Sequence, residues 1–436
     1  MGKSRVVHIA VHMGEGVGKA IGGLAVADTS NRHEIVVLEQ PHKMGHIAYC
    51  RENGVAVTIC PDNEVLAERV AHSDVVVVNW WNHPSLLVAL RELCDMPSRM
   101  MLWSHVNGLH YPLLPAKFAS AFEACLFTSP ISLRSPHWTS SERETILGKS
   151  ELVYGMGEYH PQAQPCKKTY ALHDPIRIGY VGTLDYAKLH PQFVSYCKAV
   201  LERGIHAQFL LAGEPSSSLV ADVQRNNLTE HISFLGFQKN IPELLISFDL
   251  FGYLLNPRSF ATTENALLEA MAAGLPIITS NGDAEGAIIT DGMDGFVVAD
   301  AAAYADKIVE LMQSDSLRSR LGIAARDSVC KKYNVAENIG RFDRTIFRVS
   351  EKNKTKHDFA LGDEAFDWFL SCCPEKARAL FLETVVCDND IRFDQLKSEA
   401  NSLGDIFRAK QKGSAFQFSR YFPADKKMQK ICELYE

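Results

Sequence analysis

The first third of the chain alternates short apolar runs with amphipathic stretches. The runs are rich in Val, Ile and Leu and are too short for helices, so they predict strands that are buried on both faces. They lie at residues 6–11, 34–38, 55–59, 74–79, 100–104 and 125–128, and a last run follows at 150–154. Strands that alternate with helices predict βαβ units and a parallel sheet. We therefore expect one α/β domain over residues 1–154.

A second pattern of the same kind follows a polar, proline-bearing stretch. Residues 155–174 have the composition of a linker, and we expect a second α/β domain over residues 175–330. Its predicted strands are residues 176–181, 208–212, 232–237, 249–255 and 277–279. Amphipathic helices are expected to close this domain at residues 331–349. Residues 350–436 form an extension that is expected to be helical and has no assigned role.

Composition narrows the classes of function. The chain has 436 residues, enough for two or three domains, and a formal net charge of −7, which argues against a general nucleic-acid binder. No apolar run approaches the roughly 20 residues that a membrane-spanning helix needs. The eleven cysteines are scattered without a C-x-x-C spacing, so neither a zinc site nor a disulfide framework is indicated. We expect a cytoplasmic protein.

The stretch from residue 256 to 280 carries the strongest candidate chemistry. It reads as a strand end, a loop, a helix over residues 263–273 and a new strand, with Thr262 and Thr263 as candidate caps. The start of such a helix offers unpaired N–H groups and a positive dipole end at the carboxyl edge of a sheet. Phosphorylated ligands bind at such edges, here through the backbone near Thr262, Thr263, Asn265 and Ala266.

A glycine-rich loop follows the first predicted strand. Gly14 and Gly18 enclose three residues and Ala20 follows Lys19, so the loop does not fit a phosphate-binding P-loop. A dinucleotide-binding loop would need a third glycine where Lys19 or Ile21 stands, although Glu39 ends the second strand where a ribose-binding acid is expected. This second interpretation stays open.

The sequence LEAMAAGLP at residues 268–276 resembles the signature of the large retaining GT-B glycosyltransferase family numbered four, the group 1 glycosyl transferases. In that family the second Glu of a pair holds the ribose of a nucleotide-sugar donor, and Glu269 matches it. The first Glu should stand eight residues earlier, where this chain has Ala261. The nearest acid, Glu264, lies about 140° around the helix from Glu269 and also suits the first helical turn as a dipole partner.

Other segments extend the resemblance. Residues 176–191 resemble the family's diphosphate-binding loop, in which Lys188 matches the conserved Lys, while Thr183 stands next to Gly182 where an Arg is usual. Arg258 is a candidate substitute for that Arg. Gly14 and Gly16 match the family's first loop, where the backbone approaches the donor diphosphate or the acceptor. His105, just after a strand, matches a His that reaches the transferred sugar.

The resemblance implies a GT-B fold, with two Rossmann-like domains whose parallel sheets face a cleft, plus the helical extension. It implies transfer of a sugar from a nucleoside diphosphate sugar to a hydroxyl of a glycan, a lipid-linked or another acceptor, with retention and without a metal or cofactor. The catalytic candidates are His105, Lys188 and Glu264. Such enzymes commonly assemble surface polysaccharides or glycoconjugates.

Two other classes of function stay open. Ala261 and Thr183 also fit a non-catalytic scaffold that binds nucleotide sugars, and the fold and the first loop also fit a sugar-nucleotide epimerase or an NAD-dependent dehydrogenase. The basic stretch at residues 408–430, interleaved with aromatic residues, can contact an anionic membrane surface. A solvated helix that covers the body of the protein is the preferred interpretation of that stretch.

Overall fold

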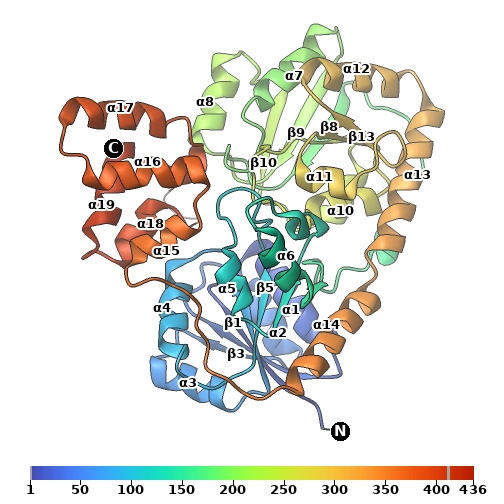
Figure 1. Cartoon of the computed structure of the whole chain (residues 1–436). Coiled ribbons are helices and arrows are strands. Elements are labelled where there is room, and N and C mark those ends of the chain that lie inside the picture. The colour runs from blue at the N-terminus through green and yellow to red at the C-terminus, as the bar shows by residue number, and fades with distance from the viewer. Residues whose placement is uncertain (1, 410–412) are drawn as a thin grey trace. The chain divides into compact units, whose positions relative to one another are not determined.

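The chain folds into two compact units, seen in a computed structural model that describes residues 2–409 and 413–436 (Figure 1). Unit 1 combines residues 1–159 with residues 335–436, and unit 2 comprises residues 160–334. The helix that begins at Val335 therefore belongs to unit 1, whereas residues 331–349 were expected to follow the second domain as its closing helices.

Unit 1 is built on a seven-stranded parallel sheet in the order β3-β2-β1-β4-β5-β6-β7. The strands are β1 (Arg5–Ala10), β2 (Arg32–Val37), β3 (Ala56–Ile59), β4 (Val75–Trp80), β5 (Met100–Ser104), β6 (Ala124–Phe127) and β7 (Ser150–Leu152). Every residue of β4, β5 and β6 is buried, as expected for strands covered on both faces. The strand order reverses direction between β1 and β4, and α/β proteins bind ligands at the carboxyl edge of such a point.

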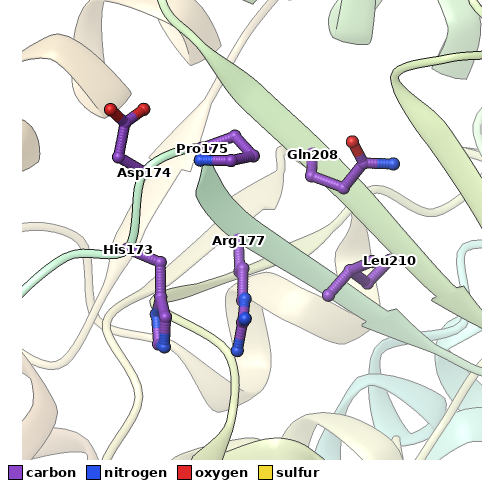
Figure 2. A pocket seen from close by; sticks show the side chains of 6 residues that line it. All are labelled: His173, Asp174, Pro175, Arg177, Gln208 and Leu210. Atoms are coloured by element: carbon purple, nitrogen blue, oxygen red, sulfur yellow. The ribbon is translucent and has the colours of Figure 1, made fainter.

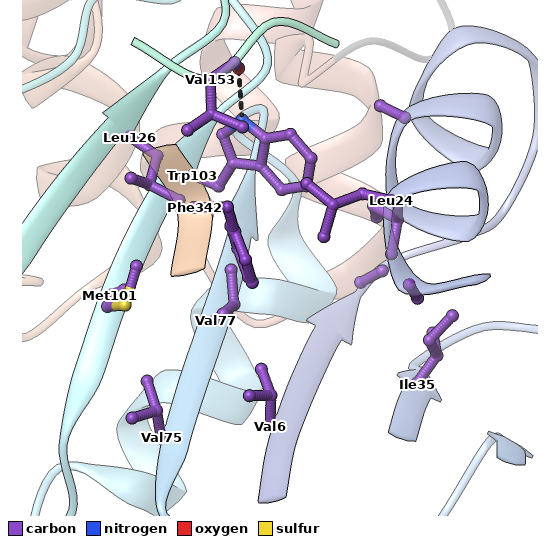
Figure 3. Packing of buried hydrophobic residues seen from close by; sticks show 14 of the residues in the cluster. Val6, Leu24, Ile35, Val75, Val77, Met101, Trp103, Leu126, Val153 and Phe342 are labelled. Atoms are coloured by element: carbon purple, nitrogen blue, oxygen red, sulfur yellow. Dashed lines mark hydrogen bonds between the residues drawn. The ribbon is translucent and has the colours of Figure 1, made fainter. Parts of the chain in front are cut away.

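Helices cover both faces of this sheet, as in a Rossmann-like domain. They are α1 (Glu15–Ala27), α2 (Gly45–Glu52), α3 (Asn63–Ala71), α4 (Pro84–Leu93), α5 (Ala116–Ser120), the 3-10 helix η1 (Pro130–Arg134), α6 (Ser140–Leu147) and α14 (Val335–Ser350). Helix α14 places Phe342, Ile346 and Val349 in the main apolar cluster beside Trp103, whose indole N–H donates to the Val153 carbonyl at 3.2 Å (Figure 3). The core of unit 1 is therefore completed by a helix distant in sequence.

Unit 2 has a six-stranded parallel sheet in the order β10-β9-β8-β11-β12-β13. Its strands are β8 (Ile176–Val181), β9 (Ala207–Ala212), β10 (Ile232–Gly236), β11 (Leu250–Tyr253), β12 (Ile277–Ser280) and β13 (Phe296–Val298). Its helices are η2 (Pro161–Ala163), α7 (Phe193–Glu202), α8 (Ser217–Arg225), α9 (Ile241–Ile246), α10 (Asn265–Ala272), α11 (Asp283–Ile288), α12 (Ala301–Met312) and α13 (Asp315–Lys332). The second parallel α/β domain predicted from the sequence is confirmed.

The extension is helical, as predicted, and packs on unit 1. Its elements are α15 (Ala365–Ser371), α16 (Glu375–Val386), α17 (Asp390–Ala400), η3 (Asp405–Phe407), α18 (Ala415–Tyr421), α19 (Lys426–Cys432) and η4 (Glu433–Tyr435). In Figure 1 this orange and red group lies beside α4, which α18 contacts. The Trp368 ring lies 4.9 Å from Phe118, and its N–H donates to Asn82 Oδ1 at 2.9 Å. Lys410 and Lys412 of the basic stretch lie outside the described residues.

Within the described ranges, no helix is both long and apolar enough to cross a membrane.

Candidate active site

Two loops meet at the carboxyl edge of the unit 2 sheet. One loop follows β8 and the other follows β11, and backbone hydrogen bonds join them, from His190 N–H to the Leu254 carbonyl at 2.9 Å and from Asn256 N–H to the Lys188 carbonyl at 2.7 Å. The Asn256 side chain adds a hydrogen bond to the Tyr186 carbonyl at 2.7 Å. The sequence analysis missed this role of Asn256, although its place between a buried strand and a proline was visible. These bonds fix the position of Lys188 relative to the strand ends.

Lys188 and Glu264 form an ion pair at this edge. Lys188 Nζ lies 2.9 Å from Glu264 Oε2, and the Tyr253 hydroxyl donates to the same oxygen at 2.5 Å. The Glu264 side chain is 8% exposed and that of Lys188 24%. Burial alone would raise the pKa of Glu264, but the Lys188 charge and the hydrogen bonds from Tyr253 and Lys188 bring it below its usual value. The carboxyl group is therefore ionised at neutral pH.

Helix α10 begins two residues later than predicted. Glu264, rather than Thr262 or Thr263, occupies its N-cap position, and the Glu264 side chain makes no capping hydrogen bond because it is directed to Lys188 and Tyr253. The first turn leaves Asn265 half-buried. The Glu264 carboxylate also accepts from the Thr262 backbone N–H, so this one of the N–H groups expected to meet a phosphorylated ligand is bound within the chain.

The other donor candidates lie on the same edge with different exposure. Ala266 and Glu269 on α10 are half-buried, as is Thr183, whose carbonyl accepts from the Tyr180 hydroxyl at 3.2 Å. Arg258 is exposed, and its backbone N–H donates to Asn256 Oδ1 at 2.9 Å. The structure thus brings Lys188 and Glu264 into direct contact and holds the other unit 2 candidates on the neighbouring loop and helix ends.

Two glycines allow the loops of this edge to approach closely. Gly182 has φ +148° and Gly213 has φ +145°, both in the region that favours glycine. A Cβ on Gly213 would stand 2.1 Å from the Gly182 carbonyl oxygen. The sequence analysis named Gly182 and missed Gly213, which was detectable as a glycine directly after a predicted strand.

His105 lies at the carboxyl edge of the unit 1 sheet, directly after β5. Its Nε2 lies 3.0 Å from Asn79 Oδ1, and because Asn79 Nδ2 donates to the Ile9 carbonyl at 3.1 Å, Oδ1 accepts and His105 Nε2 carries the proton. Burial lowers the pKa of His105 to about 3. His105 is thus neutral with Nδ1 as a hydrogen-bond acceptor. Asn79, a polar residue inside a buried strand, was not identified from the sequence.

The glycine-rich loop starts α1, with Gly14 at the N-cap position donating to His12 Nδ1 at 3.2 Å. Gly16 is exposed, and a Cβ there would meet nothing within 4 Å. The tight approaches instead involve Gly18, where a Cβ would stand 2.2 Å from the Met13 carbonyl oxygen, and Gly23, where it would stand 2.4 Å from Glu158 N. Packing therefore explains Gly18 and Gly23 and leaves Gly14 and Gly16 as candidates for contact with a ligand.

A pocket of unit 2 lies at the opposite edge of its sheet (Figure 2). It is lined by His173, Asp174, Pro175, Arg177, Gln208 and Leu210. Five of these residues precede β8 or lie at the start of β8 or β9, and Leu210 lies within β9, whereas Lys188 and α10 follow the carboxyl ends of strands. The pocket therefore contains none of the predicted site residues.

Residues 175–314 match the protein family described as glycosyl transferases group 1. Among similar proteins, N-acetyl-alpha-D-glucosaminyl L-malate synthase of Bacillus anthracis is 29% identical over 164 residues, which are 37% of this chain and 42% of that protein. The capsular polysaccharide biosynthesis glycosyltransferase CapM of Staphylococcus aureus is 26% identical over 200 residues, 41% of this chain and 49% of CapM. The chain thus spans about half the length of these relatives.

Solved structures extend the similarity of fold beyond this segment. Anabaena Alr3699/HepE in complex with UDP and glucose has a TM-score of 0.64 at 12% identity, covering 79% of this chain and 100% of that one. At this level of identity the similarity concerns the fold alone.

Proposed function

Because residues 175–314 form a glycosyl transferases group 1 domain and the chain has the GT-B fold, we propose that this protein is a glycosyltransferase. It moves a sugar from a nucleoside diphosphate sugar to an acceptor hydroxyl. The observation that carries the proposal is the family match over the same strands whose carboxyl edge presents Lys188 beside the start of α10. A lysine charge beside the start of a helix suits a diphosphate.

Unit 2 holds the donor in this proposal. Lys188 and the backbone at the start of α10 bind the diphosphate, the Gly182 loop allows its close approach, and Glu269 binds the ribose hydroxyls. Glu264 neutralises part of the Lys188 charge, so the exposed Arg258 and the N–H groups supply the remaining compensation. Uridine is the base to test first, since the similar Anabaena protein is described with UDP.

The transfer step needs no metal in this proposal. The bond from the anomeric carbon to the diphosphate oxygen breaks, the acceptor oxygen bonds to the same face of that carbon, and the acceptor proton passes to the leaving diphosphate. Retention of configuration follows from attack on that face. Lys188 stabilises the developing charge of the leaving group, and Glu264 acts as a positioning residue that holds Lys188 in place.

His105 is the unit 1 group assigned to the transferred sugar. Its neutral ring leaves Nδ1 free to accept a hydrogen bond from a sugar hydroxyl, whereas a charged imidazolium would only donate. Because Asn79 fixes the tautomer, we assign His105 to positioning the sugar and not to proton transfer.

The acceptor in this proposal is a glycan or a lipid-linked sugar, and the enzyme works in the cytoplasm on surface polysaccharide or glycoconjugate assembly. The name of the similar CapM protein supports that context. Arg420 of α18 and Lys426 of α19 are exposed, and they are the candidates for a peripheral contact with anionic lipid.

A thermal-shift screen tests the donor site. Full-length protein is heated with UDP, GDP, ADP, their sugar conjugates and NAD, with and without magnesium, alongside Glu269→Ala and the control Glu230→Ala, whose side chain is exposed on the same unit. We expect one nucleoside diphosphate to raise the melting temperature without metal, in the wild type and the control but not in Glu269→Ala. No shift with any nucleotide, or a shift with NAD alone, would contradict the proposal.

A non-catalytic nucleotide-sugar scaffold is the second candidate function. Ala261 stands where the family pattern has an acid, and it is 6% exposed. Binding of a nucleotide sugar with neither transfer nor hydrolysis would favour the scaffold. Conversion of the donor sugar without an acceptor would instead indicate an epimerase.

A further inference from the structure

The C-terminal extension is built into the carboxyl edge of the unit 1 sheet. The Tyr111 hydroxyl donates to the Gly413 carbonyl, and the Gln417 side chain lies 2.6 Å from His83 Nε2. A Cβ on Gly413 would stand 2.4 Å from the Asn82 carbonyl oxygen, so this approach requires glycine. The loop after β4 is therefore in direct contact with residues more than 300 positions later.

The inner residues of this edge are buried and are engaged in these contacts. Asn82 is 0% and His83 2% exposed. Gly413 N–H donates to Gln417 Oε1 at 2.8 Å, so the Gln417 amide nitrogen donates to His83 Nε2, while the Ser85 backbone N–H donates to His83 Nδ1 at 3.2 Å. His83 Nδ1 lies 3.3 Å from Glu39 Oε1. These buried contacts thus join the extension to Glu39, which lies two residues after β2.

The outer residues of the same edge remain accessible. The Glu39 side chain is 29% exposed and accepts from the hydroxyl of Tyr421, which is itself 39% exposed. The Trp81 side chain is half-buried, with its ring 4.9 Å from His12 and 5.1 Å from His83, and its indole nitrogen is buried. Arg420 is exposed beside Tyr421.

These outer groups are the kinds that bind sugars. A carboxylate accepts hydrogen bonds from sugar hydroxyls, a guanidinium donates to sugar oxygens, and an aromatic ring offers an apolar face to a sugar ring. Two of the groups come from the strand ends of unit 1 and two from the extension. Neither part of the chain presents the whole set alone.

We propose that Glu39, Trp81, Arg420 and Tyr421 form a binding surface for the acceptor sugar, and that the extension determines which acceptor is used. The proposal rests on the glycosyltransferase function proposed above and assigns part of its acceptor site to residues 413–421. It also gives Glu39 a role other than binding the ribose of a dinucleotide, since its carboxylate is bound to Tyr421 and faces His83.

Saturation-transfer NMR on full-length protein tests this surface without turnover. The probes are the p-nitrophenyl α-glycosides of glucose, galactose, mannose and N-acetylglucosamine. The variants are Arg420→Ala and Tyr421→Phe, and the matched control is Lys376→Ala, an exposed cation of helix α16, which contacts α19. We expect at least one glycoside to bind the wild type and the control, roughly tenfold weaker binding to Arg420→Ala, and roughly threefold weaker binding to Tyr421→Phe.

The thermal shift by nucleotides is measured on the same samples, which separates the two proposals. Loss of glycoside affinity with an unchanged nucleotide shift supports the acceptor surface. Equal glycoside affinity in the wild type and both variants, or no glycoside binding to the wild type, overturns it. Binding of a glycoside but of no nucleotide by the wild type would contradict the proposed function, but it would not contradict the sugar-binding surface.

Discussion

Glu264 affects both the proposed chemistry of unit 2 and its stability, because it is paired with Lys188. Its carboxylate is nearly inaccessible to water and is balanced by Lys188 and the Tyr253 hydroxyl. Breaking a buried ion pair by removing one partner leaves an uncompensated charge, which costs more than the pair contributes. The same Lys188 is our candidate for the leaving diphosphate. Loss of activity on replacing it therefore has two sources, which a double variant separates.

We predict that Lys188→Met destabilises the protein by about 3 kcal/mol because Glu264 loses its counter-charge. The double variant Lys188→Met with Glu264→Gln should recover most of that stability, since Gln still accepts from the Tyr253 hydroxyl. Urea unfolding gives the stabilities and a donor-hydrolysis assay gives the activity, which we expect to be absent in both variants. Activity that returns together with stability would show that Lys188 has no part in the reaction.

We predict that the free energy of unfolding decreases as the pH is lowered below about 6.5. His83 and His105 have pKa values of about 3 because burial disfavours their charged form, so only the unfolded state gains protons between pH 6.5 and 3. The loss from pH 7.5 to 5.5 is about 1.4 kcal/mol per histidine. Other buried groups titrate as well, so urea unfolding of His105→Gln is compared with the wild type. A pH-dependent loss as large in the variant would contradict this account.

At the scale of elements, Trp368 of α15 fastens the extension to unit 1. We predict that Trp368→Ala costs about 3 to 5 kcal/mol, because it removes a large buried ring and leaves Asn82 Oδ1 without its donor. The control Ile391→Ala on α17 removes a side chain that is 73% exposed and should cost less than about 0.5 kcal/mol. Chemical unfolding measures both. Similar small losses would mean that the extension adds little stability.

The strands, and the sheet edges at which the candidate site residues lie, were predictable from local sequence patterns. A strand buried on both faces appears in the sequence as an apolar run, and the residues after it lie at the carboxyl edge, so the loops of Lys188 and His105 could be placed there. The two residues themselves were nominated from the family resemblance. The contacts of Glu264 with Lys188 and of Gln417 with His83 could not, since they join residues far apart in sequence and no local periodicity encodes them.

Helix α14 shows that the contacts of a whole helix, like those of a single side chain, could not be predicted from local sequence. Its amphipathic pattern predicted a helix, but the sheet that its apolar face covers depends on the path of the chain. The Asn338 side chain exchanges two hydrogen bonds with the Tyr154 backbone, at 2.8 and 3.0 Å, and fixes α14 on unit 1. The sequence predicted the element correctly, whereas its unit was visible only in the structure.

At the scale of the whole molecule, unit 2 is one continuous segment and unit 1 is made of two. We predict that residues 160–334 fold alone and keep the nucleotide-dependent thermal shift, since the unit has its own sheet and core. Residues 1–159 alone should not fold stably, because Phe342, Ile346 and Val349 are missing from their core. Circular dichroism and thermal melting of both fragments check this. A folded 1–159 fragment would contradict it.

This arrangement has a consequence for synthesis on the ribosome. The seventh strand of the first sheet leaves the exit tunnel while the helix that covers its apolar surface is still untranslated, and roughly 180 residues must be added in between, a delay of about 10 to 40 s. Throughout that interval the nascent chain exposes apolar surface while the second unit folds. Nascent-chain binding by a chaperone should therefore begin near residue 153 and end only after α14 has emerged.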